Sequence, residues 1–477
     1  MNTHKTPTEL WAMSAVDLAA GIAAGKFSSR EATESALQRL DAVNHQINAV
    51  VEQTRDEALA AADRADQAVR RGDKTGVLNG VPITIKMNVD WTGHARNNAI
   101  REMQGNIADD DSPVTANLLK SGAVILGQTN TPAFCARSFT SNELYGYTLN
   151  PWDPEITPGG SSGGGSAAVA AGIGAIAHGN DLGGSVRQPA HCCGIVGLRS
   201  TPSRIPNYNP SVALDRPYVH QSTTSQGPMA RSVADAYLGF RAMAQRDYRD
   251  PWWSPRLPEE DQAPFPCKVA LFYADDEIEP EVRASLQRAA KMLEDAGCTI
   301  EDVAPPRYDE AWGLHQSLLQ AERATGLLKN IATYGDTFLR TKFDFIGQWD
   351  LIEPIETRDD YIAKVAMRTT ILREWMKFFE TYPLILMPNM HMQALPRDFD
   401  QGDHAQVLRA IKACKPHHVT ALLALPGLSV PTGMTNGIVD GVQLVANRMQ
   451  DEFLFRAGAA IEARAGTFTP IDPRGAT

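Results

Sequence analysis

Cysteine is scarce in this chain, and its few residues show none of the spacings that hold a metal. The six cysteines lie at positions 135, 192, 193, 267, 298 and 414, with no C-x-x-C pair among them. Cys414 and His417 form one close pair, but no second pair completes a zinc site. The sequence therefore predicts a reduced, cytoplasmic protein without a structural metal.

Long apolar runs and an excess of basic charge are missing as well. The longest nearly uninterrupted apolar run, residues 167–177, has 11 residues, which is too short to cross a bilayer. The first ten residues lack the apolar core of an export signal. Lys and Arg number 45 against 56 Asp and Glu, which gives a net charge of −11. We therefore expect no membrane span and no nucleic-acid partner, because such a surface repels phosphate backbones.

What is present is the composition of a large folded protein. Hydrophobic residues make up 43% and charged residues 21% of the 477 residues, which is ordinary globular usage. The first 75 residues predict helices that cover the outside of a larger domain. Residues 28–31 have the spacing of a capping box, and a second helix is expected from about Glu52 to Arg71, ending at Gly72.

After these helices, short apolar strands alternate with helices. Strands are expected over residues 81–85, 123–127, 269–273 and 299–303, and helices over residues 113–122, 167–172 and 280–296. This alternation predicts an α/β fold: a single large domain with a central mixed β-sheet covered by helices on both faces. The sequence carries no signal of the oligomeric state.

One stretch departs from average composition. From Pro158 it reads PGGSSGGGSAAVAAGIGAIAHGNDLGGSVRQPAHCCGIVG. Glycine permits close backbone approach, so such loops can present backbone N–H groups to a bound atom. Ser161 and Ser185 lie beside glycines and are 24 residues apart, and Lys86 ends a predicted strand 75 residues before Ser161.

Four interpretations of this stretch compete. Residues 159–163 match the G-x-S-x-G elbow of α/β-hydrolases, but that motif needs a preceding strand, and residues 150–158 contain three prolines. A phosphate cradle lacks its lysine-containing motif. A purely structural tight loop is the third interpretation. The fourth is a catalytic set of two serines and a lysine.

The fourth pattern is similar to that of the amidase signature family. The resemblance covers the stretch from Pro158 to Gly197, GVPITIK ending at Lys86, and the shorter matches GQTNTP, GPMARS, LPGLSVP and GVQL further along the chain. It implies the amidase signature fold and hydrolysis of an amide, anilide or carbamate through an acyl-enzyme, without metal or organic cofactor. Within that one domain we assign helices to residues 1–75, the catalytic core to 76–235, a variable substrate-side region to 236–410 and a return to the core to 411–477.

The resemblance also implies residue roles. Ser185 is the expected nucleophile, Ser161 the bridging serine after a cis peptide at Gly160, and Lys86 the base. The backbone N–H groups of Leu182, Gly183, Gly184 and Ser185 are expected to form the oxyanion hole. The expected substrate-binding residues are Cys135 and Gly160, together with Tyr208 and Tyr218, which are expected only from the aromatic composition of residues 208–220.

Elementary chemistry agrees with a lysine base. A serine hydroxyl needs a base to become a nucleophile, and neither His178 nor His191 has an evident carboxylate to orient it; we expect His178 to be a satisfied core residue. Lysine acts as a base only when neutral, which near pH 7 requires a pKa about 3 units below its reference value. Burial at the end of a strand lowers the pKa in that direction.

Two rival functions remain, and the sequence departs from the family pattern at several positions. One rival is the A-type subunit of a glutamine-dependent tRNA amidotransferase, and the other is a catalytically silent scaffold. Met87, Ala133, Asn180 and the run from His191 to Cys193 differ from the usual residues, although none is one of the three catalytic positions. These departures limit what can be transferred about the substrate.

Overall fold

Eleven strands build one mixed sheet through the molecule. The computed structural model describes residues 7–274, 278–346 and 353–475. The strands of the large sheet are β1 (Val50–Gln53), β2 (Pro82–Lys86), β3 (Val124–Thr129), β6 (Ile176–Asp181), β7 (Val196–Arg199), β8 (Ser225–Ala230), β9 (Lys268–Leu271), β10 (Thr299–Asp302), β11 (Leu384–Pro388), β12 (Gly427–Thr435) and β13 (Ile438–Ala446). A separate small hairpin consists of β4 (Ser141–Asn142) and β5 (Gly146–Tyr147).

The strand order is β1-β3-β2-β6-β8-β7-β12-β13-β11-β9-β10. β2 lies parallel to both β3 and β6, whereas β6 and β8 are antiparallel. At the other end of the sheet, β9 is parallel to β10 and β11. Because the carboxyl ends of parallel strands meet at the same sheet edge, the ends of β2 and β6 are brought side by side.

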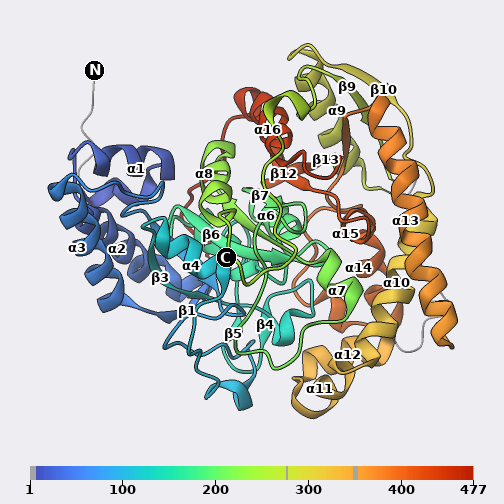
Figure 1. The fold of residues 1–477 in the computed structure, drawn as a ribbon, viewed down its shortest axis with the longest axis horizontal. Coiled ribbons are helices and arrows are strands. Elements are labelled where there is room, and N and C mark those ends of the chain that lie inside the picture. The colour runs from blue at the N-terminus through green and yellow to red at the C-terminus, as the bar shows by residue number, and fades with distance from the viewer. Residues whose placement is uncertain (1–6, 275–277, 347–352, 476–477) are drawn as a thin grey trace.

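Helices cover both faces of this sheet (Figure 1). They are α1 (Ala15–Ala23), α2 (Ser29–Ile47), α3 (Arg55–Arg71), α4 (Pro113–Lys120), α5 (Gly163–Ala170), α6 (Arg187–Cys193), α7 (Tyr218–Thr223), α8 (Val233–Met243), α9 (Pro280–Glu294), α10 (Tyr308–Ala324), α11 (Leu327–Tyr334), α12 (Thr337–Ile346), α13 (Arg358–Thr381), α14 (His404–Ala413), α15 (Lys415–Leu422) and α16 (Asp451–Ala465). Helices α1, α2 and α3 gather at one end of the molecule, and α10 and α13 lie at the opposite end.

Alternate residues of β3 show why both faces are covered. Ile125 packs into one core with Leu118 of α4 and Phe240 of α8. Its neighbours Val124 and Leu126 pack into a second core with residues of α2, α5 and α6. Successive side chains of a strand point to opposite faces, so a strand buried along its whole length requires a helical layer on each side. The predicted α/β fold is confirmed.

The predicted helix boundaries hold at the capping box and at Gly72, but they differ near Glu52 and at the start of α5. The capping box at Ser28 and Glu31 is present, and the second helix ends at Gly72 as expected. That helix starts at Arg55 and not near Glu52, because residues 50–53 form edge strand β1, which pairs with β3. Helix α5 begins at Gly163, four residues before the predicted start.

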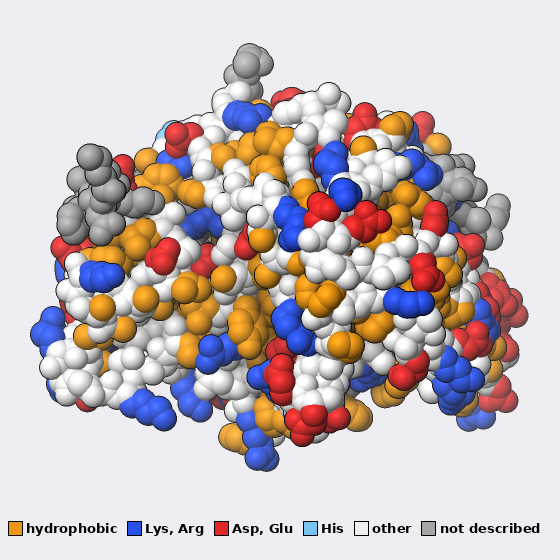
Figure 2. Space-filling view, turned by 90° about the horizontal axis from the view of Figure 1, so that it is seen from above, with side chains coloured by type: hydrophobic (Ala, Val, Ile, Leu, Met, Phe, Trp, Pro, Cys, Tyr) orange, Lys and Arg blue, Asp and Glu red, His pale blue; other side chains and the backbone are white. Residues whose placement is uncertain are grey.

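Two properties of the structure bear on partners. Within the described ranges, no helix is both long and apolar enough to span a lipid bilayer. Figure 2 shows basic and acidic side chains interspersed over one face of the protein, with no extended patch of either sign on that face. Interspersed charges create no strong field that would concentrate a polyanion there.

Candidate active site

Lys86 is the last residue of β2 and is fully buried. Its Nζ atom lies 2.7 Å from Ser161 Oγ, 3.0 Å from Ser162 Oγ and 2.9 Å from Asn180 Oδ1. Ser161 and Ser162 precede α5, and Asn180 is near the end of β6. The sheet edge where β2 and β6 end therefore gathers one amine and three oxygen atoms in a buried space.

These three contacts suit a neutral amine. The amide oxygen of Asn180 can only accept, and the Ser162 hydroxyl donates to the Asn180 carbonyl at 3.5 Å and so accepts from the lysine. Two N–H groups of a neutral amine satisfy these two acceptors. A lysine that has lost its proton then has its lone pair left for the third partner, the hydroxyl of Ser161, which is the nearest of the three at 2.7 Å.

Electrostatics favour the same protonation state. Burial lowers the pKa of Lys86 below its ordinary value because the charged form loses its hydration. The Cys135 thiol and the Asp181 carboxylate act in the opposite direction, and the guanidinium of Arg216 adds to the lowering. The direction agrees with the shift that a lysine base requires.

The loop that carries Ser161 is held by close backbone packing. The Gly160–Ser161 peptide bond is cis, as the resemblance implied. Thr131 Oγ1 donates to the Ser161 carbonyl at 2.8 Å. Gly160 is buried, and a Cβ atom there would lie 2.6 Å from the backbone nitrogen of Phe139. Gly160 thus packs against the protein backbone and shapes the loop.

Ser185 lies in the turn between β6 and α6. Its side chain is half-buried, in contrast to the fully enclosed Lys86. The Ser162 N–H donates to the Ser185 carbonyl at 3.3 Å, which ties this turn to the loop of Ser161. The two glycine-rich loops of the sequence are therefore in direct contact.

The same turn presents backbone donors. In the described part of the chain, no acceptor receives the N–H groups of Leu182, Gly183 or Ser185. The Gly184 N–H, in contrast, donates to Asp181 Oδ1 at 2.7 Å. Gly184 has a φ of +114°, which a residue with a side chain rarely adopts. Three of the four expected oxyanion donors are thus free to bind an oxygen, and the fourth is already used.

A buried ion cluster anchors the turn between β6 and α6. Asp181 accepts from Arg187 Nη2 and Nε, each at 2.9 Å, and lies 3.2 Å from Arg199 Nη1. Burial alone would raise the pKa of Asp181, but the two guanidinium groups hold it well below its usual range. A carboxylate that is charged and fully paired fixes the conformation of the turn it anchors.

Comparison with known proteins decides the family. Residues 31–455 match the family model described as Amidase. The chain is 41% identical to the indoleacetamide hydrolase of Bradyrhizobium diazoefficiens over 464 residues, which are 96% of this chain and 87% of that protein. The chain belongs to the amidase signature family. As an amidase, it hydrolyses amide-type carbon–nitrogen bonds.

Other relatives cover nearly the whole amidase chain. It is 32% identical to the A-type subunit of the glutamyl-tRNA(Gln) amidotransferase of Synechococcus sp. (strain WH7803), over 93% of this chain and 95% of that protein. The structure of a bacterial aryl acylamidase of the amidase signature family matches with a TM-score of 0.79 and 25% identity, over 95% and 96% of the two chains. The structure of 6-aminohexanoate cyclic dimer hydrolase with its substrate matches with a TM-score of 0.83 and 24% identity, over 98% of this chain and 99% of that chain. This match shows the common fold.

The hydrolase elbow, one of the alternative interpretations of the glycine-rich stretch, finds no support in the fold. No strand precedes Ser161: residues 150–158 are irregular, so the hydrolase elbow is absent from this described stretch.

His178 is a buried core residue whose Nε2 lies 2.8 Å from Gln226 Oε1, and burial lowers its pKa to about 4. Burial also lowers the pKa of His191 to about 4.

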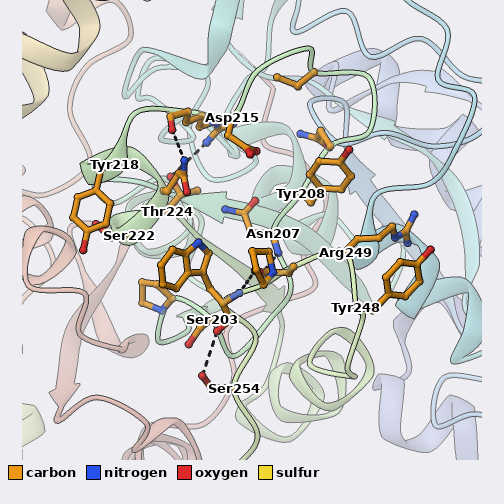
Figure 3. A pocket seen from close by; sticks show the side chains of 18 of the residues that line it. Ser203, Asn207, Tyr208, Asp215, Tyr218, Ser222, Thr224, Tyr248, Arg249 and Ser254 are labelled. Carbon is orange, nitrogen blue, oxygen red and sulfur yellow. Dashed lines mark hydrogen bonds between the residues drawn. The ribbon is translucent and has the colours of Figure 1, made fainter.

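The predicted substrate-binding residues fall into two groups. Tyr208 and Tyr218 both line a cavity of about 960 Å³ beside the segment 202–224 (Figure 3). Cys135 is not among the described residues that line it. The Cys135 thiol instead lies 3.1 Å from Thr131 Oγ1, close to Lys86 and Ser161.

Ser162 and Asn180 were missed as partners of the lysine. Ser162 adjoins Ser161 in the sequence, so its proximity was available as a signal. Asn180 was noted only as a departure from the family pattern. Its Nδ2 also donates to Asn88 Oδ1 at 2.9 Å, which orients its amide oxygen toward Lys86.

Proposed function

We propose that the amidase works through an acyl-enzyme on Ser185, with Ser161 relaying the proton and Lys86 as the base. The observation that carries this proposal is the 2.7 Å contact between Lys86 Nζ and Ser161 Oγ in a fully buried space. The lone pair of the neutral lysine accepts the proton of Ser161, which in turn takes that of Ser185. A hydroxyl that loses its proton as it attacks becomes an effective nucleophile.

The N–H groups of Leu182, Gly183 and Ser185 are the proposed donors to the oxyanion. All three lack an acceptor among the described residues, which supports this role. Donors already in place cost no reorganisation when the tetrahedral intermediate forms, and each contributes about 3 kcal/mol to lowering the barrier. Gly184 is left out because its N–H is donated to Asp181.

The leaving amine needs a proton before the carbon–nitrogen bond breaks. That proton returns from Lys86 through Ser161 to the amine nitrogen, and the amine departs. Water then attacks the acyl carbon while Ser161 passes its proton to Lys86. The bond between Ser185 Oγ and the acyl carbon breaks, the proton returns through Ser161 to Ser185 Oγ, and the carboxylic acid leaves. Each step uses the same chain of three groups, so no metal ion or organic cofactor takes part in the proposed mechanism.

The proposed substrate is a linear amide whose acyl group carries an aromatic ring. A relative 41% identical over 96% of this chain is named indoleacetamide hydrolase, which supports a primary arylacetamide. The cavity lined by Tyr208 and Tyr218 also includes Tyr248 and Trp252, which supports an aromatic ligand, and Lys86, Ser161 and Ser185 lie outside its lining. Residues 236–410 contribute Trp252 and Leu372 to this lining, in keeping with a substrate-side region.

A panel of substrates tests this proposal. The purified chain is assayed with phenylacetamide, indole-3-acetamide, p-nitroanilides, a methyl carbamate and glutamine, with the Ser185→Ala variant as a control. We expect the arylacetamides to have the highest kcat/KM and the variant to be inactive. Turnover of glutamine, with none of the aromatic amides hydrolysed, would overturn the proposal of an aromatic substrate.

The A-type amidotransferase subunit is the second candidate, supported by relatives at 32% identity. Such a subunit passes ammonia to a partner protein, so its glutaminase activity would require that partner. Hydrolysis of an arylacetamide by the isolated chain favours the amidase. Co-purification of a second subunit, together with glutaminase activity only in its presence, favours the amidotransferase.

A further inference from the structure

Two histidines from different helices stack beside the oxyanion turn. His315 belongs to α10 and His418 to α15, and their rings lie 4.7 Å apart at an interplanar angle of 12°. A Cβ atom placed on Gly183 would lie 3.2 Å from His418 Cδ2 and 3.8 Å from the Nε2 atoms of both rings. Both Nε2 atoms therefore converge on the side of the turn where Gly183 has no side chain.

A single glutamine fixes the tautomer of both rings. The Nε2 atom of Gln316 lies 3.2 Å from Nδ1 of His315 and 3.2 Å from Nδ1 of His418. An amide nitrogen only donates, so both Nδ1 atoms must accept, which leaves the proton of each neutral ring on its own Nε2. The arrangement thus turns two Nε2–H donors toward the oxyanion turn.

Both rings are held in the neutral form. Burial lowers the pKa of His315 well below its ordinary value, and burial lowers that of His418 to about 3. The surrounding charged and titratable groups mostly act in the same direction: for His315 they are His418, Arg323, His220 and Arg199, and for His418 they are Arg323, Lys342, Arg187 and, with the opposite effect, Asp181.

One of the two donors has nothing to bind in the protein. The side chain of His315 is 3% exposed, and its Nε2 finds no hydrogen-bond partner among the described residues. A buried N–H without an acceptor costs about 1–3 kcal/mol, so such groups in native proteins are retained where something else binds them. The position beside Gly183 points to the substrate.

We propose that His315 and His418 form a specificity site that donates two hydrogen bonds to an acceptor atom of the substrate close to its scissile amide. The class it selects is an amide with an ether-type or carbonyl oxygen one or two bonds from the reacting carbonyl, as in aryloxyacetamides or alkoxyamides. This inference rests on the proposed amidase mechanism and adds a preference to it. Among otherwise similar arylacetamides, a site built to hydrogen-bond a substrate favours the one that carries the acceptor over its methylene isostere, because the donors are left unpaired with the isostere.

The tautomers are tested without any turnover. Two-dimensional 15N NMR of the histidine-labelled protein distinguishes a protonated Nε2 from a protonated Nδ1, and the His315→Phe and His418→Phe variants assign the two signals. We expect both rings in the neutral Nε2–H form at pH 7 and unchanged at pH 5.5. In Gln316→Glu the carboxylate accepts, so the protons should move to Nδ1. Nδ1–H rings in the wild type would overturn the proposal.

Specificity is tested with isosteric pairs that exchange one oxygen for a methylene. The acyl-side pair is phenoxyacetamide and 3-phenylpropanamide, and the amine-side pair is the N-methoxy and N-ethyl amides of phenylacetic acid. The ratio of kcat/KM within each pair, compared between wild type and variant, cancels the intrinsic reactivity. His315→Phe keeps a stacked ring but removes the N–H donor. In this variant we expect kcat/KM for the oxygen-bearing amide of one pair to fall about tenfold relative to its methylene partner.

A conservative variant separates recognition from folding. His315→Gln places an amide N–H near the position of Nε2 and should restore most of the preference for the oxygen-bearing amide. His45 is exposed, so the control variant His45→Gln should leave that preference unchanged. If His315→Phe folds and hydrolyses both pairs with wild-type ratios, the specificity site is wrong. If no amide is hydrolysed by the wild type, the proposed function fails instead, and the NMR result still stands by itself.

Discussion

The Nζ atom of Lys86 lies 2.7 Å from the Oγ atom of Ser161, and both side chains are almost completely buried. In the neutral amine of the proposed mechanism, the two N–H groups bond to Ser162 and Asn180, which leaves the lone pair for the hydroxyl of Ser161. The proposed mechanism gives the two neighbouring serines different tasks: Ser161 exchanges a proton with the lysine, whereas Ser162 holds the lysine in place.

Alanine substitutions separate these tasks. We expect Ser161→Ala to lower kcat by about 10³-fold, since proton relay between base and nucleophile is lost. Ser162→Ala removes one acceptor from Lys86 and should cost about tenfold or less. Initial rates of ammonia release from phenylacetamide measure both. Equal losses in the two variants would contradict the assignment of Ser161 as the relay.

The pH profile tests the neutral lysine. In the proposed mechanism Lys86 acts without its proton, so kcat/KM should rise with pH on the acid side as the lysine deprotonates. Burial lowers the pKa of Lys86, so this limb should lie below the ordinary lysine pKa. Asn180→Asp puts a carboxylate at the amide position 2.9 Å from Nζ, which favours the charged lysine. The acid limb of the kcat/KM profile should then move about 1–2 pH units higher.

The control for this shift is Asn180→Thr. A threonine carries no charge, so it does not favour the charged lysine as a carboxylate would. Its acid limb should stay close to that of the wild type. A profile that is unmoved in Asn180→Asp would exclude the lysine as the titrating base.

The ion cluster behind the turn predicts a difference in stability. Asp181→Asn leaves the guanidinium groups of Arg187 and Arg199 buried without their carboxylate, and should lower the free energy of unfolding by about 3–5 kcal/mol. Asp472→Asn is the matched control: Asp472 pairs with Arg39 but is 86% exposed, so its loss should cost less than about 1 kcal/mol. Urea unfolding measures both.

The sign of the pH effect follows from the lowered pKa of Asp181. A carboxyl group whose folded pKa is depressed stabilises the fold above its unfolded pKa, about 3.9, and this contribution is lost as the pH falls through the folded value. The difference in stability between the wild type and Asp181→Asn should therefore be full at pH 7 and smaller in strong acid. A constant difference would contradict the ion-pair explanation.

Gly184 is predicted to be irreplaceable. Its φ is +114°, and a Cβ atom there would lie 2.7 Å from His417 Nδ1, so Gly184→Ala should destabilise the protein by about 1–3 kcal/mol and distort the donors of the turn. Gly105→Ala is the control, since nothing lies within 4 Å of its added Cβ. Thermal unfolding and kcat/KM are measured on both; equal values would show that the turn tolerates a side chain.

Much of this site could be predicted from the sequence. The β-branched run before Lys86 indicated a strand that ends in an amine, and the glycine-rich stretch indicated loops that pack closely. Ser161 and Ser185 stood out because they lie among those glycines. These features are local, and they match a family pattern, so one sequence was enough to name them.

What could not be predicted depends on contacts between distant segments. Residues 52 and 53 were predicted to begin a helix because the pairing of β1 with β3 is a tertiary contact. The use of the Gly184 N–H by Asp181 follows from the conformation of the turn, which spacing does not give. His315 and His418 are 103 positions apart and meet only because α10 packs against α15.

The most direct test of the proposed mechanism is the site at which a fluorophosphonate attaches. Such a probe reacts with the serine whose hydroxyl is activated, and peptide mass spectrometry locates the adduct. We predict stoichiometric labelling of Ser185 in the wild type and almost none in a folded Lys86→Ala variant. An adduct on Ser161, or labelling of Ser185 that is unaffected by loss of the lysine, would contradict the proposed transfer of a proton from Ser185 through Ser161 to Lys86.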